Sequence, residues 1–309
     1  MRWGYNINDM KYIAVLVCMC CLLWGCAGSE SGSHESGVTS VFSLDNLTAW
    51  CIVPFDSKQR GPEERALMLK GLGITKMAYD WRVEHISTFD EELDMLKKYG
   101  IKLQGFWLNI DQHPEKDPYL PIILDLLRRH GIQTQLWCLL ADDEKWKGMS
   151  QQERVAYSAR PIAYVASEAE KIGCTVGLYN HGGWFGEPEN QLAIIEHLDM
   201  SNIGMVYNFH HAELQADRFS SFFPEIMPHL LALNISGLKG LKPSRVVPVG
   251  QGDVEAGLLQ IVKDSGYRGP IGIINETTDP DAEEGLRINI EGLKTILKDI
   301  GDAEALRSY

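Results

Sequence analysis

The chain has 309 residues, a formal net charge of −13 and 45% hydrophobic residues. That is enough apolar material for one large α/β barrel or two small domains. The acidic surface repels phosphate backbones, which argues against nucleic acid as a partner.

The N-terminal residues 1–26 are predicted to form a signal peptide. Lys11 precedes an apolar run over residues 12–24, which is too short to span a bilayer comfortably and suits a signal-peptide core. At its end, Leu23-Trp24-Gly25-Cys26 resembles a bacterial lipobox, which implies that Cys26 is lipidated and becomes the mature N-terminus. We therefore expect an exported protein, lipid-anchored to the bacterial membrane on the periplasmic side or at the cell surface. An ordinary hydrophobic anchor left in place is the alternative.

Residues 27–41 are small and polar without periodicity, which predicts a flexible tether, and residues 42–309 are predicted to form the folded domain. Four of the seven cysteines lie in the signal segment. Cys51, Cys138 and Cys174 remain, an odd number on apolar stretches, so a disulfide framework is not expected.

One unit repeats along the domain: a short apolar run, a polar loop, and an amphipathic helical stretch that ends in glycine. Glycines at positions 73, 100, 131, 173 and 266 are expected to cap these helices. Near-continuous apolar strands that alternate with helices indicate a parallel sheet. Eight strands are predicted, at Leu47–Val53, Ile74–Tyr79, Ile101–Leu108, Ile132–Leu140, Thr175–Asn180, Asn202–Asn208, Leu230–Ile235 and Pro270–Asn275.

Eight such units in about 260 residues have the size and count of a (β/α)₈ TIM barrel. An open doubly wound sheet is the structural alternative, but it would usually carry a glycine-rich phosphate loop after the first strand, and WCIVPFDSKQRGPEE (50–64) has none. The stretch between Ile235 and Asp253 is too long for a plain loop, and it is predicted to hold a short extra strand at Arg245–Val249.

Polar and aromatic side chains stand where the predicted strands end, which is where a TIM barrel carries its reactive groups. Amides bind hydroxyl groups directionally and tryptophan faces stack on the C–H faces of sugars, so we expect an uncharged, carbohydrate-sized ligand. Core packing is the alternative role for a tryptophan here, and turn formation is the alternative for an asparagine. The residues are Asp56, Asp80, Trp81, Arg82, Trp107, Asn109, Trp137, Asp142, Asn180, His181, Asn208, His210, His211, Asn234, Lys239, Asn275 and Glu276.

The loop YNHGGWFGEPENQ (179–191) is the most specific local signal. His181 leaves the strand, and two glycines let the backbone approach a ligand over which Trp184 can lie. Pro188 is expected to begin the next helix, where its missing N–H does no harm. His210 and His211 are adjacent, so only one of them is expected to face the site.

Two segments carry a family resemblance. VGQGDVEAGLLQIVKDSGYRGPIGI (249–273) and Asn208-Phe209-His210-His211 resemble the xylose-isomerase-like barrels of the sugar phosphate isomerase/epimerase superfamily, in particular an exported branch with YNHGGW and N-F-H-H segments. The resemblance implies a TIM barrel, possible dimerisation, and His211 as the position that hydrogen-bonds the substrate. It also implies one divalent cation, held in the family by Glu, Asp, His and Glu from strands five to eight.

The chain departs from that ligand set. Asn180 or His181, Asn208 and Asn234 stand at the first three positions, and only Glu276 can supply a carboxylate. Amides are weaker ligands for hard cations than carboxylates. Two alternatives remain: Mn²⁺, Zn²⁺ or Mg²⁺ binds through His181, His211 and Glu276, or general acid–base catalysis operates without a metal.

The expected activity is removal of a proton next to a carbonyl of a sugar or keto-sugar, as in an isomerase, epimerase or lyase. His211 or His181 would be the base and Glu276 the second acid/base. A catalytically silent, lipid-anchored carbohydrate-binding protein is the alternative. Lys239 would stabilise a developing enolate, and the remaining substrate contacts are expected from Asn180, Asn208, Asn234, Trp107, Asn109, Trp137, Trp184 and Arg82.

Overall fold

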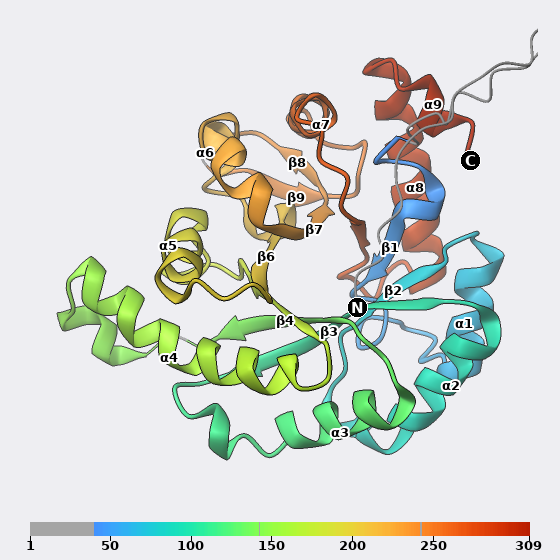
Figure 1. The fold of residues 1–309 in the computed structure, drawn as a ribbon. Helices are drawn as coiled ribbons and strands as arrows, with labels where there is room; N and C mark the ends of the chain where they lie inside the picture. Colours follow the sequence, from blue (N-terminus) through green and yellow to red (C-terminus); the bar gives the residue numbers. More distant parts are fainter. Residues whose placement is uncertain (1–39, 142, 242) are drawn as a thin grey trace, which may run out of the picture. The chain divides into compact units, whose positions relative to one another are not determined.

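The computed structural model describes residues 40–141, 143–241 and 243–309. The predicted signal peptide, Cys26, most of the tether and Asp142 lie outside this part of the chain. Eight parallel strands close into a barrel in the order β1-β10-β7-β6-β5-β4-β3-β2, which confirms the TIM barrel and excludes the open sheet (Figure 1). The strands are β1 (Leu47–Trp50), β2 (Lys76–Tyr79), β3 (Lys102–Ile110), β4 (Gln135–Leu140), β5 (Thr175–Tyr179), β6 (Ile203–Asn208), β7 (Leu230–Ile235) and β10 (Ile271–Ile274).

The helices surround the barrel (Figure 1). All five glycines expected to cap helices have a positive φ, for example 72° at Gly100, which caps α2, and 62° at Gly131, which caps α3. Among the described helices, none is long and apolar enough to cross a membrane. The helices are α1 (Pro62–Gly71), α2 (Phe89–Tyr99), α3 (Leu120–His130), α4 (Gln151–Glu170), α5 (Pro188–Leu198), α6 (Phe219–Ile226), α7 (Glu255–Asp264), α8 (Ala282–Asp299) and α9 (Ala303–Leu306).

All the predicted strands are present, and their ends differ from the predicted ones by up to three residues. β1 ends at Trp50 because Cys51 adopts a left-handed conformation with φ of 55°, which an extended strand cannot continue. The extra strand is present as β9 (Arg245–Val247), and it pairs antiparallel with β8 (Gly237–Lys239). This hairpin occupies the long connection between β7 and α7.

Aromatic side chains fill the interior of the barrel. The rings of Trp50 and Trp137 lie 4.8 Å apart, edge to face, and the Trp50 indole N–H donates to the Tyr179 hydroxyl at 2.9 Å. Gly105 makes room for this layer, because a Cβ there would lie 2.5 Å from the Trp137 ring. The strand ends above this closed floor are therefore left to form a site.

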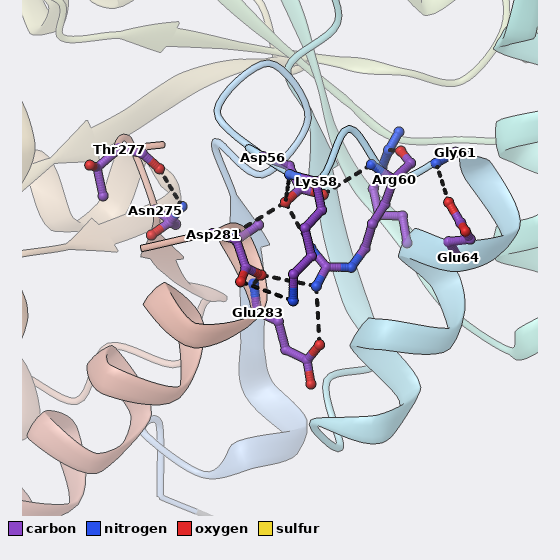
Figure 2. Close-up of polar contacts among 11 residues, drawn as sticks. Asp56, Lys58, Arg60, Gly61, Glu64, Asn275, Thr277, Asp281 and Glu283 are labelled. Carbon is purple, nitrogen blue, oxygen red and sulfur yellow. Dashed lines mark hydrogen bonds and ion pairs between the residues drawn. The ribbon is translucent and has the colours of Figure 1, made fainter. Parts of the chain in front are cut away.

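A network of ion pairs joins the loop after β1 to the start of α8 (Figure 2). The Arg60 guanidinium lies 2.7 Å from Asp56, 2.9 Å from Asp281 and 3.1 Å from Glu283. Lys58 adds a second contact to Asp281, at 3.1 Å. Since β1 and α8 belong to the first and last units, the network ties together the two ends of the barrel domain.

Candidate active site

A cavity of about 340 Å³, including its open mouth, lies at the carboxyl ends of the strands. We call it the inner cavity. Of the residues with a role predicted from the sequence, it brings together His181, His211, Glu276, Arg82 and Trp107. Its walls also include Trp50, Cys51, Phe55, Asp80 and Tyr179.

Two imidazoles stand side by side at the inner cavity. The ring centroids of His181, which follows β5, and His211, which follows β6, are 4.1 Å apart. Burial, with the neighbouring charges of His181 and His210, lowers the pKa of His211 to about 3, although Glu276 acts in the opposite direction. The His211 ring is therefore uncharged near pH 7.

Glu276 contacts a histidine for which the sequence analysis predicted no catalytic role. Nε2 of His210 lies 2.9 Å from Oε2 of Glu276. Burial of Glu276 disfavours its charge, but the hydrogen bond from His210 and the electrostatic influence of His210, His211 and His181 lower its pKa below the ordinary value. The backbone N–H of His210 donates to Asn208 Oδ1 at 2.9 Å, which fixes the turn that carries both histidines.

Asp80 follows β2 and is 2% exposed. Its Oδ1 accepts a hydrogen bond from the Val53 N–H at 3.3 Å, and its Oδ2 has no partner among the described residues. Burial raises the pKa of Asp80 to about 7, against the lowering effect of Arg82. In the sequence, only its position at a strand end marked Asp80 as a candidate site residue, and the sequence analysis predicted no catalytic or binding role for it.

The three asparagines expected to hold substrate belong to the frame of the barrel instead. The Asn180 amide accepts from the Asn208 N–H at 2.7 Å and donates to the Asn208 carbonyl at 3.1 Å, so it bridges the ends of β5 and β6. The Asn208 amide donates to the Tyr179 hydroxyl. Asn234 is fully buried against Gly272, where any Cβ would overlap its Oδ1. None of the three lines the inner cavity.

A larger outer cleft of about 990 Å³ adjoins the inner cavity. Trp107 and Arg82 line both spaces, and Asn109 lines the cleft alone. The cleft also has aromatic walls in Trp81 and Tyr119. Trp107 and Arg82 therefore form a wall that the cleft and the inner cavity share.

Three further expected contacts lie elsewhere. Trp137 is fully buried in the barrel floor, where its indole N–H donates to Gln135 at 2.8 Å. Trp184 packs on Trp146 at 5.4 Å and donates to Gln151, so it does not cover the inner cavity. Lys239 is exposed on β8 and lines neither space.

Comparisons with known proteins agree on the fold. The profile of the xylose isomerase-like TIM barrel family matches residues 79–296. No curated protein matches the chain by sequence. Among solved structures, the chain is similar to an IOLI protein with a bound zinc atom (TM-score 0.64, 12% identity, 82% of this chain and 98% of that chain). It is also similar to a 3-keto-D-glucoside 4-epimerase from E. coli (TM-score 0.60, 11% identity, 82% of this chain and 99% of that chain). A third similar structure is a xylose isomerase-like TIM barrel protein from Mycobacterium smegmatis in complex with magnesium (TM-score 0.58, 13% identity, 86% of this chain and 99% of that chain).

The residues of this chain do not fit the metal site that the fold family implies. Among the described residues, no group of three or more His, Cys, Asp or Glu side chains is arranged to hold a metal ion. The amides of Asn180 and Asn208 are engaged with the backbone and with Tyr179, and the Glu276 carboxylate is engaged with His210. We therefore derive no catalytic step through a metal.

Proposed function

Because the chain belongs to the xylose isomerase-like TIM barrel family, we propose that it is an isomerase, epimerase or lyase that removes a proton next to a carbonyl of a sugar or keto-sugar. The observation that carries this proposal is the His181–His211 pair, 4.1 Å apart, in a cavity that also contains Glu276. Such a cavity offers a neutral base, a fixed negative charge and a fixed positive charge within one small space.

His211 is the base in this proposal. The substrate C–H bond breaks, its proton goes to the imidazole, and its electron pair moves to the carbonyl oxygen. The negative charge of Glu276 favours the imidazolium that forms, because it raises the pKa of His211 against the effects of burial. Arg82, rather than Lys239, supplies positive charge to the developing enolate, since it lines the inner cavity.

The outer cleft suits the rest of an uncharged sugar. Trp81, Trp107 and Tyr119 offer ring faces on which sugar C–H groups stack. Asp111 and Asp117 line the same cleft and would repel a phosphate group. The expected substrate is therefore a ketose or a keto-glycoside without phosphate.

Proton exchange with solvent tests this proposal before the product is known. The full chain is incubated in D₂O with a panel of ketoses and 3-keto-glycosides, and loss of sugar C–H signals is followed by NMR. We expect exchange by the wild type and a loss of about 10²–10⁴-fold in His211→Gln. His197→Gln is the matched control, because His197 is exposed on α5.

Wild-type protein that exchanges no sugar proton contradicts an enzymatic role. If the same sugars then alter tryptophan fluorescence, the catalytically silent carbohydrate-binding protein becomes the better assignment. Unchanged turnover and unchanged ligand affinity in His211→Gln would remove His211 from the mechanism.

We propose in addition that the protein is exported and held at the membrane by a lipid on Cys26. The apolar run 12–24 and the lipobox-like Leu23-Trp24-Gly25-Cys26 support this proposal. Membrane fractionation of the wild type and of Cys26→Ser tests it, with mass spectrometry of the mature N-terminus. A wild type that lacks the lipid would contradict it.

A further inference from the structure

Asp80 and His211 approach the inner cavity from opposite sides of the barrel. In the closed strand order, β2 and β6 are separated by β1, β10 and β7 in one direction and by β3, β4 and β5 in the other. Asp80 follows β2, His211 is carried on the turn after β6, and both line the inner cavity. A ligand in this cavity therefore has the carboxyl group on one side and the imidazole on the other.

The surroundings of the Asp80 carboxyl group favour its protonated form. It is 2% exposed, its Oδ2 has no hydrogen-bond partner in the part of the chain that the structure describes, and the Arg82 guanidinium donates to the backbone carbonyls of Asp80 and Trp81. A buried carboxyl group without a paired cation is usually neutral. Other groups whose charge acts on Asp80 or that share its cavity are Arg65, Cys51, His181, His211 and Glu276.

We propose that Asp80 is the acid that returns a proton to the face of the substrate opposite His211, so that the enzyme inverts a carbon centre as an epimerase. This inference rests on the proposed function and narrows it, because a lyase or an isomerase that works on one face does not need an acid across the cavity. The placement of Asp80 and His211 on opposite walls carries it.

The reaction balances without a further reactant. His211 takes the proton from the carbon next to the carbonyl, and the C–H electron pair forms the enolate. The enolate then collapses to the carbonyl while the same carbon takes the Asp80 proton on its other face. Asp80 is left as a carboxylate and His211 as an imidazolium. His211 then gives its proton to water and Asp80 takes a proton from water, which restores both groups.

The variant Asp80→Asn separates proton removal by His211 from proton delivery by Asp80. Asparagine keeps an oxygen for the Val53 N–H but cannot deliver a proton. His211 can still remove a substrate proton and return a deuteron to the same face. In D₂O, with the ketose and 3-keto-glycoside panel, we expect continued exchange by Asp80→Asn, while formation of the inverted sugar falls by about 10²-fold or more.

Two further variants complete the test. Asp80→Glu restores the carboxyl group and should recover part of the inversion. Asp302→Asn is the matched control, because Asp302 is another buried aspartate, far from the inner cavity, which caps α9. It should invert sugar at the wild-type rate.

The outcomes separate a failure of Asp80 from a failure of the proposed function. Inversion at the wild-type rate by Asp80→Asn overturns the inference, and so does an equal loss of exchange and inversion in a variant with a wild-type thermal unfolding midpoint. Wild-type exchange without an inverted product overturns the inference and leaves the proposed function standing. A wild type without any exchange overturns both.

Discussion

Nε2 of His210 lies 2.9 Å from Oε2 of Glu276, and this contact changes what the carboxylate can do. A carboxylate expected from the family resemblance to bind a cation instead accepts a hydrogen bond from a side chain two strands away in the barrel order. The pair places a negative charge beside His211 and leaves the imidazole of His211 free for the substrate.

The first prediction is that activity does not depend on a divalent metal. Exhaustive dialysis of the full-length protein against EDTA should leave proton exchange unchanged, and added Mn²⁺, Zn²⁺ or Mg²⁺ should not raise it. The reason is the donor set, in which Asn180, Asn208 and Glu276 already have protein partners. Activity lost on dialysis and restored by one of these ions would contradict this expectation.

A second prediction concerns the pH dependence of inversion. Asp80 delivers a proton only while it is protonated, and burial raises its pKa to about 7. The rate of inversion should therefore fall about tenfold per pH unit above pH 7. Exchange by Asp80→Asn should lack this fall, and a wild-type rate that stays level up to pH 9 would exclude Asp80 as the acid.

The same shift predicts a stability effect that does not depend on any substrate. The folded-state pKa of Asp80 lies above its unfolded-state value, so between about pH 4 and pH 7 the folded protein binds more protons than the unfolded chain. The contribution of Asp80 to stability is then fully present below pH 4 and is lost as the pH rises to 7. In urea unfolding, the free energy of unfolding of Asp80→Asn should increase relative to that of the wild type as the pH rises from 4 to 7. A difference between the two free energies that does not change with pH would contradict the raised pKa.

The barrel could be predicted from the sequence because its signals are local. Each strand is a short apolar run, and several helices end at or just before a glycine such as Gly100 or Gly131, whose left-handed conformation is needed at that residue alone. The strands and caps therefore appear at their predicted places, with boundary shifts of a few residues.

The roles of the polar residues depend on contacts between distant segments. An asparagine at a strand end, such as Asn180, can bind either a ligand or the next strand. Because β5 pairs with β6, the Asn180 side chain hydrogen-bonds to the backbone of Asn208. Apart from the family resemblance, the sequence does not show which of His210 and His211 contacts Glu276, and the structure shows that it is His210. His181, His211 and Glu276 do meet in one cavity, as expected from their positions after the strands.

The wall shared by the outer cleft and the inner cavity leads to a fourth prediction. Trp107 lines both spaces, so Trp107→Phe should weaken binding of the exchanged sugar by about tenfold or less, a loss of up to about 1.5 kcal/mol. Trp146→Phe is the matched control, since Trp146 is buried beside Trp184. Calorimetric titration of both variants measures the difference, and equal affinities would exclude Trp107 as a sugar contact.

The final prediction concerns the network that ties the loop after β1 to α8 (Figure 2). Arg60→Ala leaves Asp56, whose side chain is 2% exposed, without its cation, and should lower the free energy of unfolding at pH 7 by about 3 kcal/mol. Arg129→Ala removes exposed pairs with Asp90 and Asp125 and should lower the free energy of unfolding by less than about 1 kcal/mol. Equal effects of the two variants in urea unfolding would show that the network adds nothing beyond a surface pair.

The pH dependence of that loss has a definite sign. Burial disfavours the charge of Asp281, but hydrogen bonds from Arg60 and Lys58 outweigh this effect and lower its pKa to about 2. A depressed folded-state pKa contributes stability that is present above the unfolded-state value near 4 and is lost as the pH falls toward 2. The difference in the free energy of unfolding between wild type and Arg60→Ala should therefore be largest near pH 7 and decrease between pH 4 and pH 2. A difference that stays constant down to pH 2 would mean that Arg60 stabilises the barrel by packing rather than through its carboxylate partners.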